Sequence, residues 1–232
     1  MAAAGRDVIN MAVGEPDFDA PRLAREAAIA AIDGGAVKYT PAAGLASLRQ
    51  AVAGHLSQTR GVPFGAENVV ICHSAKHALS HTLLALVDPG DEVVLLDPAW
   101  SSYYAQVQLA GGVAVHAAPR PDGTCAPDLD AVREAITGKT RGVMLNTPSN
   151  PSGYVWTREE LEQLASICEE HDLWMISDEI YGRLVFDGAE HVSPTSISPA
   201  MKERTVLVDG ASKIFAMTGY RIGYLAATPD LA

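Results

Sequence analysis

Short apolar runs alternate with longer segments of helical periodicity over most of the chain. Apolar residues spaced three to four apart indicate a helix packed on one side, and a short run rich in β-branched residues indicates a buried strand. We therefore predict strands at residues 69–72, 92–96, 113–117, 142–145, 174–177 and 206–208. The predicted helices cover residues 21–32, 45–59, 75–87, 100–109, 129–136 and 157–170.

This alternation of strands and helices predicts an α/β fold with a mostly parallel sheet flanked by helices. Thr157 followed by Glu160 is the pattern of a capping box and fixes the start of the last helix. Residues 119–123 and 188–199, rich in Gly, Pro and polar residues, are predicted to be surface loops. In such a fold, ligands bind beyond the carboxyl ends of the strands.

The composition is that of a globular enzyme-sized domain. The chain has 232 residues, of which 48% are hydrophobic and 19% charged, enough for a large core. Its net charge of -11 argues against a nucleic-acid partner, because a phosphate backbone needs a basic surface. No apolar run reaches the about 20 residues that span a membrane, so no membrane partner is expected.

The cysteines and histidines give no metal signature in the sequence. Cys72, Cys125 and Cys168 are far apart and read as free thiols of a reducing compartment, so we expect a cytoplasmic protein. His77 and His81 lie one helical turn apart, but the segment lacks the glutamate of a zinc-protease helix. Spacing indicates no third ligand, and we predict no metal site.

The strongest chemical motif is S-K-I-F-A-M-T-G-Y-R-I-G-Y at residues 212–224. Lys213 follows a predicted strand and a small-residue turn, in surroundings that lower the pKa of an amine and suit it to Schiff-base chemistry. Arg221 is a fixed cation eight residues later, suited to holding a phosphate.

This motif resembles that of the fold-type I pyridoxal-phosphate-dependent aminotransferases of class I/II, the aspartate-aminotransferase-like family. The resemblance extends over about residues 8 to 228. It implies that pyridoxal 5'-phosphate forms a Schiff base with Lys213, which also acts as general acid–base, and that Arg221 binds the cofactor phosphate. It also implies that residues 41–232 form the cofactor-binding large domain and residues 1–40 an N-terminal segment on the substrate side.

Further motifs match the same family. The turn H-S-A-K-H at residues 73–77 precedes a helix, whose N-terminus favours an anion. The resemblance assigns Ser74, Ala75 and Lys76 to the phosphate, although the family usually has glycine at the serine. Gly210 stands where relatives often carry a hydroxyl for the phosphate, so that contact is missing or is made by Ser212.

Three motifs are assigned by the resemblance to the cofactor ring. Trp100, two residues after Pro98, is expected to stack on the pyridine and to border the substrate. Asn150 in N-T-P-S-N-P-S-G, residues 146–153, and Tyr181 are expected to donate to the phenolic oxygen. Asp178 in D-E-I-Y is expected to pair with the pyridine nitrogen, holding the ring cationic, while the neighbouring glutamate is structural.

Two N-terminal motifs point to the substrate and to a partner subunit. An apolar run at residues 8–13 breaks at Gly14, in the family's G-E-P-D-F opening, where the glycine lies beside the substrate. Tyr39, in K-Y-T-P, matches the tyrosine that reaches the partner's cofactor phosphate. The resemblance therefore implies a homodimer with a shared active site.

The function implied is transfer of an amino group between an amino acid and a 2-oxo acid. Two alternatives stay open: a relative that uses the same cofactor for β-elimination, such as a C–S lyase, and an inactive cofactor-binding remnant. Family members continue past the Lys213–Arg221 motif into a smaller domain that carries an arginine for the substrate carboxylate. Because this chain ends at Ala232, it is expected to be a fragment with that small domain missing.

Overall fold

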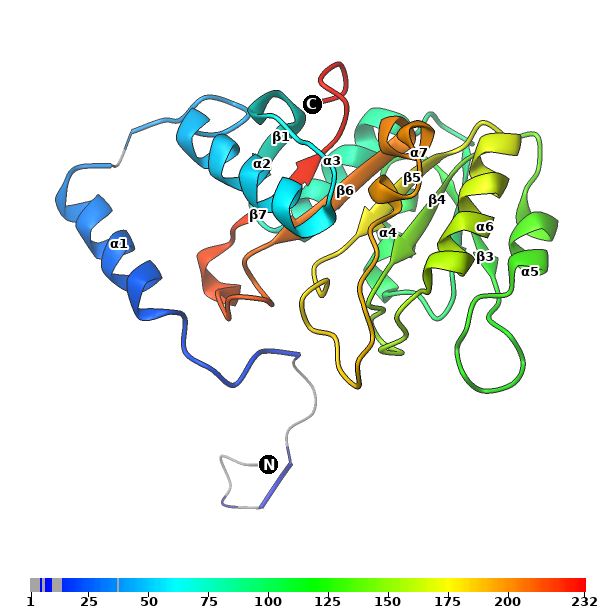
Figure 1. Ribbon diagram of the computed structural model, residues 1–232, viewed down its shortest axis with the longest axis horizontal. Coiled ribbons are helices and arrows are strands. Elements are labelled where there is room, and N and C mark those ends of the chain that lie inside the picture. Colours follow the sequence, from blue (N-terminus) through cyan, green and yellow to red (C-terminus); the bar gives the residue numbers. More distant parts are fainter. Residues whose placement is uncertain (1–4, 6, 10–13, 37) are drawn as a thin grey trace.

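A twisted seven-stranded sheet runs through the part of the chain that the computed structural model describes, namely residues 5, 7–9, 14–36 and 38–232 (Figure 1). Part of the apolar run predicted before Gly14, residues 10–13, lies outside the described residues. The strand order is β1-β7-β6-β5-β4-β2-β3. The strands are β1 (Val69–Cys72), β2 (Glu92–Leu96), β3 (Val113–Ala117), β4 (Thr140–Asn146), β5 (Trp174–Asp178), β6 (Thr205–Gly210) and β7 (Gly223–Ala226).

Most of this sheet is parallel, as the sequence predicted. Strand β2 pairs in parallel with β3 and β4, and β4–β5 and β5–β6 continue the same direction. Strand β7 runs antiparallel to both of its neighbours, β6 and β1. The pattern analysis found the other six strands but missed β7, because its four residues, Gly-Tyr-Leu-Ala, include no β-branched residue.

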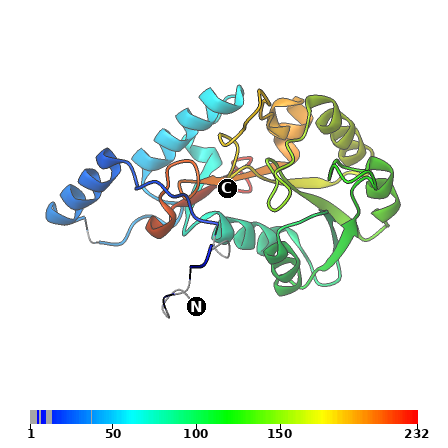
Figure 2. The same cartoon turned by 90° about the horizontal axis from the view of Figure 1, so that it is seen from below.

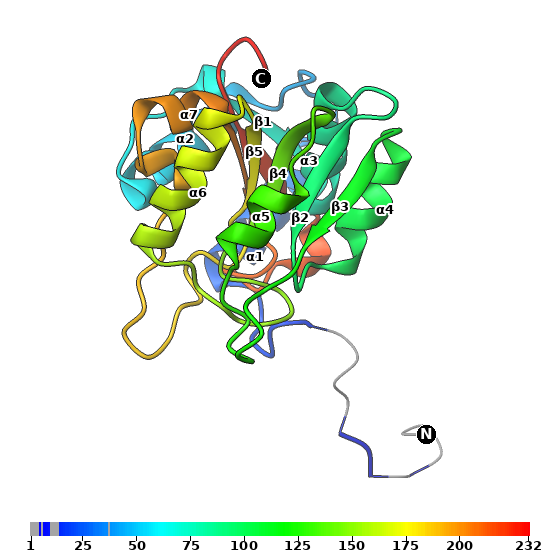
Figure 3. The same ribbon diagram turned by 90° about the vertical axis from the view of Figure 1, so that its right-hand side faces the viewer.

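Helices cover both faces of the sheet. The α-helices of the described residues are α1 (Arg22–Asp33), α2 (Ala46–Arg60), α3 (Ala75–Leu86), α4 (Ser101–Leu109), α5 (Leu129–Ala135), α6 (Arg158–Glu170) and α7 (Pro199–Arg204). Helices α3 and α4 lie on one side, and α2, α5 and α6 on the other (Figure 3). The six predicted helices are confirmed to within two residues at each end, whereas the short α7 was missed.

The start of α6 shows how local sequence fixes an element. Thr157 Oγ1 accepts from the Glu160 amide at 3.2 Å, and Glu160 Oε2 accepts from the Thr157 amide at 2.9 Å. The predicted capping box is therefore present. Two of the backbone donors that a helix start leaves without partners are satisfied reciprocally.

The loop predicted at residues 188–199 is only partly on the surface. Residues 188–190 are exposed, but Ser193 and Thr195 are buried and the short 3-10 turn Pro194–Ser196 follows. Hydrogen bonds explain why these polar residues are buried. Ser193 Oγ is hydrogen-bonded to Glu179 Oε1 at 2.7 Å and to Thr195 Oγ1 at 2.8 Å. Composition alone marked this stretch as a loop and could not show that its hydroxyls face a buried carboxylate.

Helix α1 lies apart from the sheet at one end of the molecule (Figures 1 and 2). None of its residues is buried, and Leu23, Ile29 and Ile32 are each at least 60% exposed. The division into residues 1–40 and 41–232 stays a prediction. Among the described residues, no helix has both the length and the apolar character needed to cross a membrane.

Candidate active site

The carboxyl ends of β4, β5 and β6 meet the N-terminus of α3 around a cavity of about 390 Å³. Of the twelve site residues predicted from the sequence, all but Tyr39 line it: Gly14, Ser74, Ala75, Lys76, Trp100, Asn150, Asp178, Tyr181, Ser212, Lys213 and Arg221. Its other walls are Glu15, Tyr103, Asn146, Ile180 and Thr218, which the sequence analysis did not single out. The fold thus collects motifs that are up to about two hundred residues apart in the chain.

Lys213 is placed by β6 and the turn that follows it. Its Nζ donates to the carbonyl oxygen of Gly14, and it lies 6.0 Å from the centre of the Tyr181 ring. Partial burial lowers the pKa of the Lys213 amine, with Glu15 acting in the opposite direction. A lowered pKa increases the fraction of neutral, nucleophilic amine.

Asp178 is the last residue of β5 and is almost completely buried. Its Oδ2 accepts from the Tyr103 hydroxyl at 2.7 Å and its Oδ1 from the Ile180 amide at 3.2 Å. Burial raises the pKa of Asp178 to about 6, although both hydrogen bonds act to lower it. Because burial disfavours the ionised form of this carboxyl group, a cationic partner would stabilise that form strongly.

Tyr103 is therefore a site residue that the motifs did not reveal. It is 2% exposed and comes from the first turn of α4, three residues after Trp100. The two rings meet edge to face with centres 5.4 Å apart. Their i, i+3 spacing was the available signal, since residues so spaced share one face of a helix.

The end of β4 and the turn after it, which together contain two asparagines, are hydrogen-bonded to the end of β5. Asn146 Nδ2 donates to the carbonyl oxygen of Asp178 at 2.9 Å, and Asn146 Oδ1 accepts from the Asn150 amide at 2.6 Å. The Asn150 side chain in turn contacts Tyr181. Partial burial and Asp178 raise the pKa of the Tyr181 hydroxyl, while Asn150 opposes the shift. Two polar groups thus converge on one side of the cavity.

The turn before α3 has a backbone that usually requires glycine. Ser74 has φ 86° and ψ 161°, in a region that residues with a side chain rarely adopt. Ser74 therefore adopts a conformation that glycine would adopt without steric cost. Helix α3 begins at Ala75, so its first N–H groups have no partner within the helix and can bind an anion.

Glycine at two further positions brings β7 against this turn. A Cβ on Gly223 would lie 2.1 Å from the Ser74 carbonyl carbon and 2.2 Å from the Ala75 nitrogen. A Cβ on Gly210 would lie 2.8 Å from the Ile222 carbonyl oxygen. A side chain at residue 210 would therefore require the backbone to shift, whereas Ser212 does line the cavity.

Two cationic residues, Arg221 and Lys76, also line the cavity. Arg221, in the left-handed region at φ 55°, donates from Nη1 to the Thr218 carbonyl oxygen at 2.6 Å. Lys76 Nζ lies 4.6 Å from the centre of the Trp100 ring. A guanidinium has five N–H donors, so the remaining ones can serve an anion.

Tyr39 does not line this cavity and is fully exposed. It lies on the segment between α1 and α2. Its predicted contact is with the cofactor of a partner subunit, so a single chain does not test it.

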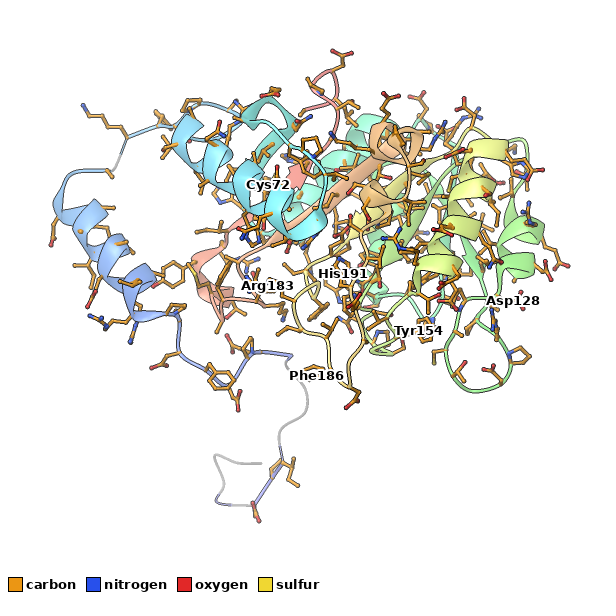
Figure 4. All side chains as sticks on the ribbon, in the orientation of Figure 1. Cys72, Asp128, Tyr154, Arg183, Phe186 and His191 are labelled. Atoms are coloured by element: carbon orange, nitrogen blue, oxygen red, sulfur yellow. The ribbon has the colours of Figure 1, made fainter. Side chains whose placement is uncertain are left out.

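A second polar cluster lies on the opposite face of the sheet. Arg60, at the end of α2, contacts Glu179 Oε2 at 2.6 Å and Asp209 Oδ2 at 2.8 Å, and all three side chains are at most 2% exposed. The Glu179 carboxylate also accepts a hydrogen bond from Ser193 Oγ. Its Oε2 lies 2.9 Å from Nε2 of His191, which is labelled in Figure 4. Burial raises the pKa of Asp209 to about 7, helped by the nearby Glu179 carboxylate, while Arg60 acts in the opposite direction. Glu179 was expected to be structural, which this cluster explains.

Comparisons with known proteins show what this arrangement is similar to. The family model for aminotransferase class I and II matches residues 6–232. Aspartate aminotransferase of Geobacillus stearothermophilus is 42% identical over 231 residues, which cover 100% of this chain and 59% of the relative. Aspartate/prephenate aminotransferase of Thermus thermophilus is 44% identical over 227 residues, covering 98% and 58%.

Solved structures agree with the sequence relatives. A structure of Thermus thermophilus aspartate aminotransferase with maleate superposes with a TM-score of 0.94 at 41% identity, covering 99% of this chain and 59% of that one. An aromatic aminotransferase from Pyrococcus horikoshii gives 0.93 at 38% identity, covering 97% and 60%. The chain thus spans about three fifths of the length of these relatives. On the family match and these identities, the chain belongs to the aminotransferase class I and II family.

Proposed function

We propose that this protein uses pyridoxal 5'-phosphate to transfer an amino group between an amino acid and a 2-oxo acid. The observation that carries the proposal is the content of one cavity: the Lys213 amine with its lowered pKa, the buried Asp178 carboxyl, and an anion-binding turn beside Arg221. Amine, carboxylate and anion site are the three groups that a phosphorylated pyridine aldehyde requires.

The residues present fit this cofactor. A cavity of about 390 Å³ lies within the range of roughly 300–1,000 Å³ for small-molecule sites. The start of α3 and Arg221 would hold the phosphate, and Asp178 would hold the pyridine nitrogen. The Tyr103 hydrogen bond fixes the carboxylate from the side, so that its orientation is set before the cofactor binds.

Lys213 has two roles in this proposal. Its Nζ would hold the cofactor through a covalent bond, and once freed by substrate the amine would take up and return the proton of the substrate Cα. The bound cofactor supplies an electron sink for the charge left on Cα. Partial burial of Lys213 favours both roles, because a neutral amine is needed for attack and for accepting the proton.

Asp178, Asn150 and Tyr181 adjust the cofactor ring. A carboxylate whose pKa is raised by burial is stabilised when it pairs with a protonated pyridine nitrogen, and it keeps that nitrogen protonated in return. Asn150 and Tyr181 would donate to the phenolic oxygen. Trp100 would cover one face of the ring, which its large aromatic surface suits.

The substrate class is drawn from relatives. Several are named aspartate or aspartate/prephenate aminotransferases, and one solved structure contains maleate, a dicarboxylate. We infer a dicarboxylic amino acid as one substrate of the whole protein. The competing function, β-elimination, releases ammonia and pyruvate instead of a 2-oxo acid with the substrate's own side chain.

The test combines cofactor labelling with product analysis. Protein mixed with pyridoxal phosphate and reduced with borohydride should carry the cofactor on Lys213, as peptide mass spectrometry shows. Lys213→Ala should lose the label, and Lys139→Ala, at an exposed position that does not line the cavity, should keep it. Labelling elsewhere would refute the assignment of Lys213. Ammonia without a matching 2-oxo acid would favour elimination over transamination.

We also propose that two chains form a homodimer with a shared active site. The support is the resemblance of the segment around Tyr39 to one that reaches the partner's phosphate, together with the full exposure of that side chain. A cytoplasmic location is proposed on the same family grounds.

A further inference from the structure

Three metal-binding side chains meet beside the turn that precedes α3. Cys72 ends β1, and His77 and His81 stand one helical turn apart on α3. One donor atom from each lies within 4.8 Å of the other two. The sequence analysis considered the histidines and found no third ligand. The fold supplies it, because the chain reverses between Cys72 and α3 and brings the thiol, labelled in Figure 4, back to the helix.

We propose that Cys72, His77 and His81 form a site for a divalent transition metal of the Zn²⁺ type. Thiolate and imidazole are the ligands that Zn²⁺ and Co²⁺ prefer. With metal–sulfur bonds of about 2.3 Å and metal–nitrogen bonds of about 2.0 Å, donor atoms of a tetrahedral site lie roughly 3.5 Å apart. The present separations therefore need only small side-chain rotations to close around an ion.

The two histidines are already oriented toward one another. Their ring centres are 3.9 Å apart, and that of His73 is 5.6 Å from His77. A neutral imidazole binds a metal through either of its ring nitrogens, so each ring can supply one ligand atom. The fourth position is open to water or, after rotation, to His73.

Binding changes two existing interactions. The His77 Nδ1 atom accepts from the His73 amide at 3.2 Å, and this hydrogen bond is lost whichever ring nitrogen binds the ion. If Nδ1 binds, its lone pair is used, and if Nε2 binds, Nδ1 carries the proton. Burial raises the pKa of the Cys72 thiol, so the metal must displace its proton. Both costs act against affinity and make binding selective for ions that bind thiolate strongly.

The site brackets the proposed phosphate turn. Cys72 and His77 are the residues on either side of His73–Lys76, so an ion that joins them closes a short loop around Ser74 and Ala75. This consequence, unlike the metal site itself, rests on the proposed function. We expect bound metal to restrict the turn whose backbone would receive the phosphate.

The test uses Co²⁺ as a spectroscopic probe on protein freed of metal with a chelator. One Co²⁺ per chain should bind, with a thiolate-to-cobalt band in the near ultraviolet and the visible bands of tetrahedral geometry, and Zn²⁺ should displace it. Cys72→Ser should remove the thiolate band. His81→Ala, at an exposed position that leaves the fold intact, should weaken binding by about tenfold or more, since even outer-shell changes cost that much.

Matched controls separate this site from surface binding. Cys125→Ser and His171→Ala change a second free cysteine and an exposed histidine remote from α3, and should bind Co²⁺ as wild type does. A cobalt complex without a thiolate band would overturn the proposal, as would equal affinity in wild type and His81→Ala. Pyridoxal phosphate binding is measured separately, so loss of the metal site and failure of the proposed function are distinguishable.

Discussion

Replacing Arg60 by methionine tests the buried ion cluster behind the active site. Methionine is an unbranched side chain that partly fills the space of an arginine, but it leaves Glu179 and Asp209 without their guanidinium. Removing one partner of a buried ion pair costs about 3–5 kcal/mol, because the remaining charge stays out of water. Glu179 keeps His191 and two serine hydroxyls, so we expect the lower end, about 3 kcal/mol.

The loss should depend on pH in a direction that Asp209 sets. Burial raises its folded pKa to about 7, above the ordinary carboxyl value, so the folded state binds this proton more tightly than the unfolded state. The stability contributed by that proton is complete at low pH and is lost as pH rises through about 7. Without the guanidinium of Arg60, an ionised Asp209 lowers the free energy of unfolding further. The effect of Arg60→Met should therefore be larger at pH 8 than at pH 6.

The assay is urea unfolding of wild type and Arg60→Met at both pH values, with the m-value checked for constancy. Arg133→Met is the matched control, because Arg133 contacts Glu170 at 2.8 Å with both side chains about half exposed. A surface pair of this kind contributes about 0–1 kcal/mol. An Arg60→Met loss no larger than that of Arg133→Met, or one equal at the two pH values, would refute the reasoning.

Other changes probe the cavity itself. Asp178→Ala should retain the cofactor but slow amino transfer by about a hundredfold or more, as measured by the half-reaction, and near-normal turnover would contradict its role. Ser74→Gly should relieve about 1–3 kcal/mol of backbone strain and cost about 0.5–1 kcal/mol in chain entropy, so the urea midpoint should rise. A lower midpoint would argue against strain at this residue. Gly223→Ala should weaken cofactor retention on dialysis, because its Cβ would push β7 from the turn, and unchanged retention would show that the contact adjusts freely. Tyr39→Phe should weaken retention in the dimer, whereas a fully active monomer would exclude a shared site.

The sequence predicted the parts of this structure that local pattern controls. The capping box at Thr157 and the strands with buried apolar runs depend on neighbouring residues, and these predictions are confirmed. The motifs around Asn150, Asp178 and Lys213 were also placed correctly at strand ends, because an α/β fold brings those ends together.

What the sequence missed depends on contacts between distant segments. The role of Tyr103 became visible only when α4 was placed over β5, and Cys72 became a candidate ligand only when β1 was placed beside α3. Strand β7 can be identified as a strand only from its pairing. Each of its four residues is paired with a residue of β1 on one side and with a residue of β6 on the other. The sequence Gly-Tyr-Leu-Ala contains no β-branched residue that would mark a strand.

The two consecutive carboxylates at the end of β5 explain why the ion cluster stands directly behind the site. Successive side chains of an extended chain point to opposite faces, so Asp178 enters the cavity while Glu179 faces Arg60 and His191. Glu179 is surrounded by donors, and those donors lower its pKa despite complete burial. Asp178 has only Tyr103 and one amide, and its pKa rises. The two neighbouring carboxyl groups thus have different partners. Glu179 is paired with cationic and polar groups of the protein, whereas Asp178 remains available to pair with a cationic ligand.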